Sequence, residues 1–406
     1  MSEAFQTIDH GSVTSPEGFS AGGMHSGLRR SKRHDLGVLY CDVPATTAAV
    51  YTTNLFQAAP LQVTQKSIAV SNQLQAVVVN SVNANACTGK QGELDALAMR
   101  SKTADMFKVE EHHVAVASTG VIGEPMPIKK ILAGIEQMPQ HVNKENGDGF
   151  NRAILTTDLT TKSIAVKLNI DGKEVRIGGA AKGSGMIHPN MATMLAFITT
   201  DAKVEQSAWK SLLSQTTNKT FNMITVDGDT STNDMVITMA SGKIEHEILS
   251  PSHPEWNNFE VAFSYVLEQL AKAIARDGEG ASKLVEVIVE HAPSERTAQV
   301  IAKQIIGSSL VKTAVFGADA NWGRIISSMG SAGETFDPQR IDIHIGDIKV
   351  LHQSQPVPFD ENKAAAYMKE SQVTITVNLH QGDERAVAWG CDLSYEYVRI
   401  NSAYRT

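Results

Sequence analysis

The chain has 406 residues, of which 42% are hydrophobic and 20% are charged, so it is long enough for a sizeable core and for two or three domains. Its formal net charge of −8 argues against a nucleic-acid partner, because binding to phosphates requires a basic surface. No apolar run approaches the ~18 residues of a membrane span, and the N-terminus lacks the blocks of a signal peptide. The three cysteines are scattered and predict neither disulfides nor a zinc site, so we expect a cytoplasmic protein without a metal.

The N-terminal part of the chain predicts a β-rich region behind a less regular start. Residues 1–27 are rich in Gly and Ser and carry few periodic apolar positions. Segments rich in β-forming residues follow at 36–40 and 48–54, and Pro44 predicts a turn between them.

A short apolar run at 75–80 predicts a buried strand that leads into a polar loop. This loop, residues 80–90, contains three asparagines, a threonine and a glycine. It could cradle a polar ligand or cap a helix that starts near Glu93, and capping is the commoner role.

A further strand is predicted from His112 to a Thr-Gly pair, Thr119 and Gly120. A glycine at a strand end can turn its N–H outward, and the neighbouring hydroxyl adds a second donor. Two such donors suit the oxyanion of acyl transfer, although a simple turn is the more frequent role of Thr-Gly. His112 and His113 do not have ligand-like spacing and are interpreted as strand residues.

The middle of the chain predicts a β segment at 154–158 and then a flexible, glycine-bracketed loop that begins at Lys182. A Pro-Asn turn at 189–190 ends the loop, and the apolar run 194–200 predicts a buried strand.

Thr193 stands at the mouth of that strand, directly after Ala192. If the bond before it is cut, a threonine offers a hydroxyl nucleophile and, in its own α-amine, a base with a reference pKa near ~8. The alternative is a strand that happens to begin with threonine.

The second half of the chain is more regular. An acidic, hydroxyl-rich loop ends at residue 234, and its aspartates do not have the spacing of a calcium-binding loop. Helical and strand periodicities then predict helices at 259–274 and 295–306, the second capped by Ser294, and a strand at 284–289. The segments 341–350 and 373–379 also have strand periodicity, with turns predicted at 346–347 and 381–383.

The ordered run from Lys182 to Asp201 resembles the self-cleavage signature of the ornithine acetyltransferase family, the glutamate N-acetyltransferases of arginine biosynthesis. The resemblance extends from Thr52-Thr-Asn54 to the last residue. It implies that the precursor cuts itself between Ala192 and Thr193, and that Thr193 then carries the acetyl group.

The resemblance also assigns roles to individual residues. It implies an oxyanion hole made by Thr119 and Gly120, and it implies substrate contacts by Thr156, Lys182, Thr193, Glu279, Asn401 and Thr406. One position departs from the family pattern, because Val82 stands where a glycine is usual in the loop 80–90.

For the fold, the irregular alternation of strands and helices predicts a layered α/β architecture. The resemblance implies sheets sandwiched between helices, with residues 1–192 and 193–406 becoming intertwined α and β chains of an α2β2 heterotetramer. No cofactor is implied, and acetyl-CoA is a candidate second acetyl donor.

The implied reaction transfers acetyl from N-acetylornithine to glutamate by a ping-pong, acetyl-threonine route, with no part for nucleic acid or membrane. One alternative is a self-cleaving aminopeptidase of the same architecture, in which water resolves the acyl-enzyme. Another is a non-catalytic protein whose glycine loop holds phosphate, but this loop lacks the residue order of a phosphate-binding loop.

Overall fold

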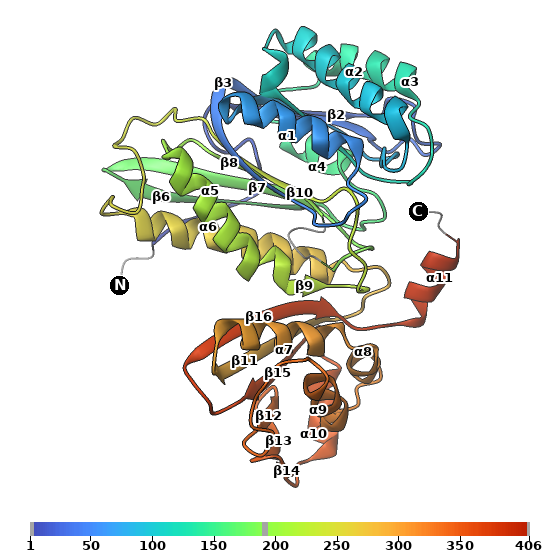
Figure 1. Cartoon of the computed structure of the whole chain (residues 1–406), viewed down its shortest axis with the longest axis vertical. Coiled ribbons are helices and arrows are strands. Elements are labelled where there is room, and N and C mark those ends of the chain that lie inside the picture. The colour runs from blue at the N-terminus through green and yellow to red at the C-terminus, as the bar shows by residue number, and fades with distance from the viewer. Residues whose placement is uncertain (1–3, 189–193, 404–406) are drawn as a thin grey trace.

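The computed structural model describes residues 4–188 and 194–403, arranged as a large layered body and a smaller sheet with its own helices (Figure 1). Within those residues the larger sheet has nine strands. Eight of them run in the order β1 (Gln6–Ile8), β6 (Lys162–Ile170), β7 (Lys173–Lys182), β8 (Leu195–Thr200), β10 (Met235–Ala240), β3 (Leu36–Tyr51), β4 (Gln73–Asn80), β5 (Val114–Ser118), and β2 (Phe19–Met24) pairs with β3.

The long strand β3 makes this sheet fold into two packed layers. Its first half pairs with β2 and β4, and its second half pairs with β10. The pairing with β4 shifts register between Tyr40 and Ala45, around Pro44, which has no N–H to give to a ladder. The prediction of two strands separated by a turn at Pro44 is therefore wrong, and one irregular strand spans both segments.

One hydrophobic core lies between the two layers and contains residues of both, including Val77 of β4 and Phe197 of β8. Helices cover the outer faces. Packed against β4 and β5 are α1 (Ala59–Ser71), α2 (Gly89–Phe107) and α3 (Ile128–Gln137); packed against the layer of β6–β8 are α5 (Gln206–Lys219) and α6 (Trp256–Arg276). The short α4 (Gly147–Ala153) inserts Phe150 against Phe197 at a ring-centroid distance of 5.3 Å. The order helix, sheet, sheet, helix confirms the predicted layered α/β fold.

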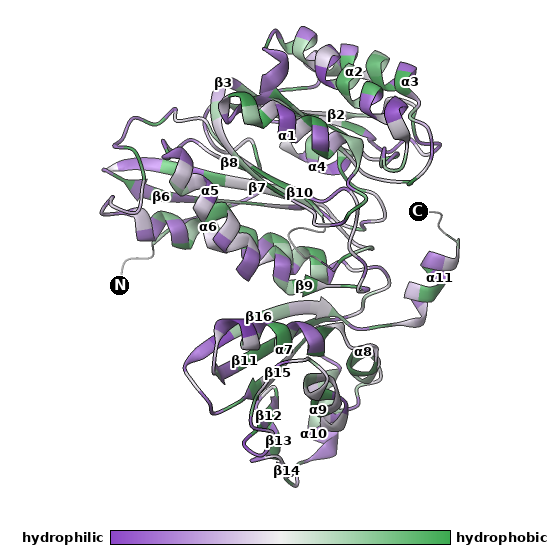
Figure 2. Ribbon diagram, viewed as in Figure 1, coloured by the Kyte–Doolittle hydropathy of each residue, from purple (hydrophilic) through white to green (hydrophobic). Residues whose placement is uncertain are grey.

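Alternation along β8 shows how the layers are specified. Phe197 faces the inner core, whereas Ile198 faces the outer core beneath α6. Since both faces are buried, all six residues of β8 are inaccessible. Helix α6 buries one apolar stripe, as its predicted periodicity requires, and Figure 2 shows hydrophilic and hydrophobic residues alternating along it.

The smaller sheet has, among the described residues, seven strands, in the order β14 (Gln355–Pro356), β13 (Ile348–His352), β12 (Asp342–Ile345), β15 (Gln372–Asn378), β11 (Leu284–Ala292), β16 (Glu384–Cys391), β9 (Ile224–Thr225). Its helices are α7 (Glu295–Gly307), α8 (Ser309–Phe316), α9 (Trp322–Gly330) and α10 (Glu361–Met368). The predicted cap is confirmed, because the Ser294 side chain accepts from the N–H of Thr297 at 3.1 Å. Finally, α11 (Tyr395–Ala403) leaves this sheet and extends back beside the larger body (Figure 1).

Residues 1–27, which carry few periodic apolar positions, contain the short β1 and the glycine-containing β2. Two local predictions are wrong. His112 and His113 lie in the 3-10 helix η1 (Glu111–His113), before the strand rather than on it. Residues 154–158 form a turn after α4, because the Asp158 carboxylate accepts the N–H of Thr156 at 3.0 Å and closes the chain locally.

The two halves of the sequence share one sheet. Strands β8 and β10 both follow position 193, yet they lie between β7 and β3, which both precede it.

The other 3-10 helices are η2 (Met138–Gln140) and η3 (Phe221–Met223). Across the described residues, no helix combines the length and apolarity that crossing a membrane would require.

Candidate active site

A cavity of about 180 Å³ lies where β5 and β7 end and β8 begins. Six residues predicted from the sequence line it: Thr119, Gly120, Thr156, Lys182, Glu279 and Asn401. They come from five separate segments of the chain. Ala192, Thr193 and Thr406 lie outside the described residues, but Met194, which follows Thr193 in the chain, also lines the cavity.

Thr119 and Gly120 present two donors to the cavity. The N–H of Thr119 is bound to the carbonyl of Asn80, which fixes the residue at the end of β5. Among the described residues, neither the Thr119 hydroxyl nor the Gly120 N–H has an acceptor. Two unpaired donors, side by side at one wall of a cavity, suit an oxyanion.

Only glycine fits at position 120. Its φ is +130°, and a Cβ there would lie 2.1 Å from the carbonyl oxygen of Val82. Val82 itself takes no positive φ, so the local backbone accepts a valine where the family pattern has glycine. The Asn233 side chain, which also lines the cavity, donates to the carbonyls of Ala84 and Ser118 and so ties the end of β5 to the loop before β10.

Lys182, the last residue of β7, brings a buried cation to a second part of the cavity lining, called here the Lys182 wall. Its residue is only 7% exposed, and its ammonium has no hydrogen bond or ion pair with any described residue. Burial lowers the pKa of Lys182, while the carboxylates of Asp158, Asp234 and Glu279 act to raise it. An unpaired buried ammonium is ready to bind an anionic group of a ligand.

Glu279 and Asn401 close the far side of the cavity. Glu279 follows α6 and is buried, and its Oε2 accepts from the Asn401 amide at 2.7 Å. This contact docks α11, as expected for a C-terminal segment that reaches the site. Gly185 makes room for the carboxylate, because a Cβ at position 185 would lie 2.4 Å from the Glu279 side chain.

Asp227 fixes the loop that leads toward the predicted cut. Its carboxylate accepts the N–H groups of Met186 at 2.6 Å and Ile187 at 2.9 Å. Burial raises the pKa of Asp227, and these backbone bonds act to lower it. The acidic loop therefore has a structural role beside the cavity.

Sequence reasoning gave no role in the site to two residues that line the cavity, Asp234 and Tyr397. Asp234 is buried next to the start of β10, and its Oδ2 has no hydrogen-bond partner among the described residues. Burial raises the pKa of Asp234 well above its ordinary value, and Lys182 acts in the opposite direction. The acidic composition of the loop was visible in the sequence, but only the fold shows that this carboxyl alone is completely enclosed.

His188, five residues before Thr193 in the sequence, is an alternative candidate for the base, and its surroundings are poor for that role at neutral pH. Burial, and then the Lys303 cation, lower the pKa of His188 to about 4. Its Nδ1 lies 3.0 Å from the Thr225 hydroxyl. At pH 7 the imidazole is therefore neutral but weakly basic.

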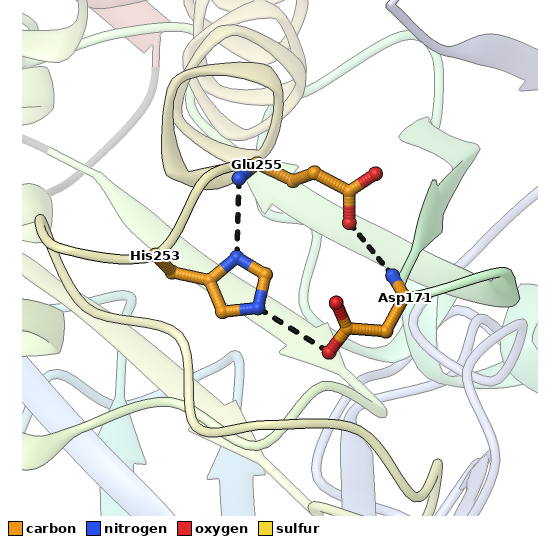
Figure 3. A group of neighbouring side chains, drawn as sticks. All are labelled: Asp171, His253 and Glu255. Carbon is orange, nitrogen blue, oxygen red and sulfur yellow. Dashed lines mark hydrogen bonds and ion pairs between the residues drawn. The ribbon is translucent and has the colours of Figure 1, made fainter.

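Within the described ranges, one group of side chains away from the cavity has the composition of a metal site: Asp171, His253 and Glu255 (Figure 3). The His253 Nδ1 accepts from the backbone N–H of Glu255, so the proton of a neutral ring is on Nε2, 3.3 Å from Asp171. The Glu255 carboxylate in turn accepts the N–H of Asp171 at 2.7 Å. No ring lone pair is left for a metal, so this group is a clamp between the β6–β7 turn and the start of α6.

The helix–sheet–sheet–helix fold, with a buried cation and two donors that have no acceptor among the described residues around a small cavity, defines the class as a layered α/β acyltransferase. The chain belongs to the ArgJ family, whose model matches residues 20–406.

Relatives match over nearly the full length. The arginine biosynthesis bifunctional protein ArgJ of Geobacillus kaustophilus (strain HTA426) is 57% identical over 399 residues, which cover 98% of this chain and 97% of that protein. The ArgJ of Halalkalibacterium halodurans is 57% identical over 400 residues, with the same shares. A crystal structure of ArgJ from Bacillus halodurans is 56% identical with a TM-score of 0.51, covering 51% of this chain and 98% of that chain.

Proposed function

We propose that this protein is a glutamate N-acetyltransferase that moves acetyl from N-acetylornithine to glutamate. In the first step Thr193 attacks the acetyl carbonyl, its α-amine takes the hydroxyl proton, and ornithine leaves with that proton. In the second step the glutamate amine attacks the acetyl-threonine ester and regenerates the hydroxyl. The products are ornithine and N-acetylglutamate.

The observation that carries the proposal is the pair of donors at Thr119 and Gly120, which have no acceptor among the described residues and line the same cavity as Met194. Met194 directly follows the proposed nucleophile, Thr193, in the sequence. In both steps the carbonyl oxygen becomes an oxyanion, and two preorganised donors stabilise it more than they stabilise the ground state.

Two charged residues of the cavity lining, Lys182 and Glu279, match the charges of the substrates. N-acetylornithine has a carboxylate and an ammonium, and the Lys182 cation and the Glu279 carboxylate are their complements. We assign the substrate carboxylate to Lys182 and the ammonium to Glu279, with Thr156 and Asn401 as polar neighbours. A cavity of about 180 Å³ suits a small metabolite better than a peptide.

Membership in the ArgJ family over residues 20–406 favours this reaction over the two alternatives. In an aminopeptidase, water would resolve the acyl-enzyme. In a binding protein, the free donors and the buried lysine would hold an anion without turnover.

We further infer that the mature protein consists of chains 1–192 and 193–406, assembled as an α2β2 heterotetramer. The interleaving of β7, β8 and β10 supports a cut that leaves both pieces in one body. The matched crystal chain, which covers about half of this chain, also supports a mature subunit of that size. The native mass tests the number of chains in the assembly, and denaturing electrophoresis tests the sizes of the two chains.

Two further proposals concern the second donor and the compartment. The relatives are named bifunctional, which supports acetyl-CoA as a second acetyl donor that gives N-acetylglutamate directly. Three free cysteines, two of them buried, support a reducing cytoplasm.

One experiment separates the functions. The purified protein is incubated with N-acetylornithine and glutamate, and the products are identified by mass spectrometry. Transfer supports the proposal, free acetate without N-acetylglutamate supports the hydrolase, and unchanged substrates support a binding protein. Repeating the incubation with acetyl-CoA in place of N-acetylornithine tests the second donor.

A further inference from the structure

A compact group of buried charges lies behind the Lys182 wall. Lys162, the first residue of β6, has a side chain that is 1% exposed. Its ammonium forms ion pairs with Asp158 at 2.8 Å and with Asp277 at 2.6 Å, and it donates to the carbonyl of Thr160 at 3.2 Å. All three donors of the ammonium are therefore used.

The two carboxylates hold the segments that carry the site. Asp158 accepts the N–H of Gly183 at 2.7 Å and belongs to the turn of Thr156. Asp277 accepts the N–H of Leu159 at 3.1 Å and lies two residues before Glu279. The strand end at Lys182, the Thr156 turn and the Glu279 corner thus converge on one ammonium.

The two lysines of this region differ in one respect. Both are buried and both act on Asp158, but only Lys162 is bonded to it. The Asp158 Oδ1 already receives Lys162 and Gly183, and its Oδ2 receives Thr156. An ammonium near an ionised buried carboxylate with a free lone pair would close onto it, because such pairs are strong at low dielectric. Burial raises the pKa of Asp234 and so disfavours its ionised form, whereas the pKa of Asp158 is lowered.

We propose that Lys162 is a positioning residue of the acetyl-transfer site: by occupying Asp158 and Asp277, it keeps the Lys182 ammonium free for a substrate carboxylate. This inference rests on the proposed function. It assigns the lysine pair two separate tasks, with Lys162 bound to the protein and Lys182 reserved for the ligand.

The electrostatics agree with this division. Burial acts to raise the pKa of Asp158, yet the cations of Lys182 and Lys162 lower it overall, so the carboxylate is ionised. Lys162 is also one of the groups that lower the pKa of Lys182. Without Lys162, an ionised Asp158 would face Lys182 alone, and the pair would close.

The test compares Lys162→Met, which has a similar length and no charge, with the double variant Lys162→Met/Asp158→Asn, in which no carboxylate at 158 can capture Lys182. Transfer is measured with N-acetylornithine and with the same compound lacking its carboxylate. We expect Lys162→Met to reduce the kcat/KM preference for the carboxylated substrate about tenfold, mainly through KM, since a bond to a charged group contributes roughly that factor. The double variant should recover the preference to within about threefold.

A merely structural role for Lys162 would lower both substrates equally and leave the preference unchanged, and that result would overturn the inference. If Lys162→Met does not fold, the single variant Asp158→Asn still tests the inference. We expect this variant to retain the preference, whereas loss of the preference would contradict a Lys182 that is kept free of Asp158. The wild type is assayed first: no transfer at all refutes the proposed function, whereas normal transfer with an unaffected Lys162→Met refutes only the role of Lys162.

Discussion

The two walls of the cavity are built on opposite principles. The Thr119–Gly120 wall is neutral, and its donors are held at the end of a buried strand with no acceptor among the described residues. The Lys182 wall is charged, and its order depends on ion pairs buried behind it. Neutral dipoles suit charge that appears only during the reaction, whereas fixed charges suit groups that the substrate always carries. The two walls should therefore control kcat and KM separately.

The largest effect is expected when the proposed nucleophile, which both walls serve, is removed. Thr193→Ala should leave one uncut chain without transfer, because no hydroxyl remains for the acyl shift or for the acetyl ester. Electrophoresis and N-terminal sequencing check the cut, and Thr193→Ser is the matched control that keeps a hydroxyl. A wild type that shows only its original N-terminus would contradict self-cleavage.

Breaking the neutral wall comes next. Thr119→Ala should lower kcat by about 10²–10³-fold, the usual cost of one oxyanion donor, with little change in KM. The cut should also slow, since the same donors face its intermediate. Thr119→Ser retains the hydroxyl and should keep most of the rate; wild-type turnover in the alanine variant would remove Thr119 from the oxyanion hole.

Breaking the charged wall should have the opposite signature. Lys182→Met should raise KM for N-acetylornithine by about 10–100-fold, because a charged hydrogen bond contributes roughly 1.5–3 kcal/mol. The effect on kcat should be smaller. The substrate without a carboxylate is the control, and an equal loss with both substrates would contradict the assignment of the carboxylate to Lys182.

The smallest effect is expected at His188. Since its pKa is lowered to about 4, its imidazole stays neutral above pH 5 and contributes no ionisation near neutrality. Activity should instead rise with pH as the α-amine of Thr193 loses its proton, because only the neutral amine can act as base. The reference pKa of an α-amine is near ~8. His188→Gln should keep transfer and the acid limb of the pH profile, so a loss of several hundredfold would make the imidazole the base.

The sequence predicts the neutral wall better than its surroundings. Thr119 and Gly120 lie in one short segment after a strand, so a local motif is enough to mark them. Lys162 and Asp277 are separated by more than a hundred residues, and nothing local indicates that they meet. Their pairing depends on α6 lying beside β6, which is a tertiary contact.

The errors have the same origin. In the local sequence Pro44 is typical of a turn. However, β3 continues through this proline, because it pairs with β4 and β10. The turn at 154–158 has β-forming residues, yet the buried Asp158 decides its shape. Helix α6 was predicted correctly, because its apolar periodicity is itself local.

The shared sheet has a consequence for the life of the molecule. Strand β8 is hydrogen-bonded to β7 on one edge and to β10 on the other, so a break before it removes one covalent bond and none of these ladder bonds. The proposed cut would therefore leave the strand pairing of the folded state unchanged. After unfolding, however, recovery would require two separate chains to find each other and would slow on dilution, whereas the uncut precursor folds at a rate independent of concentration. Each molecule would thus be able to fold as one covalent chain only once, before the cut.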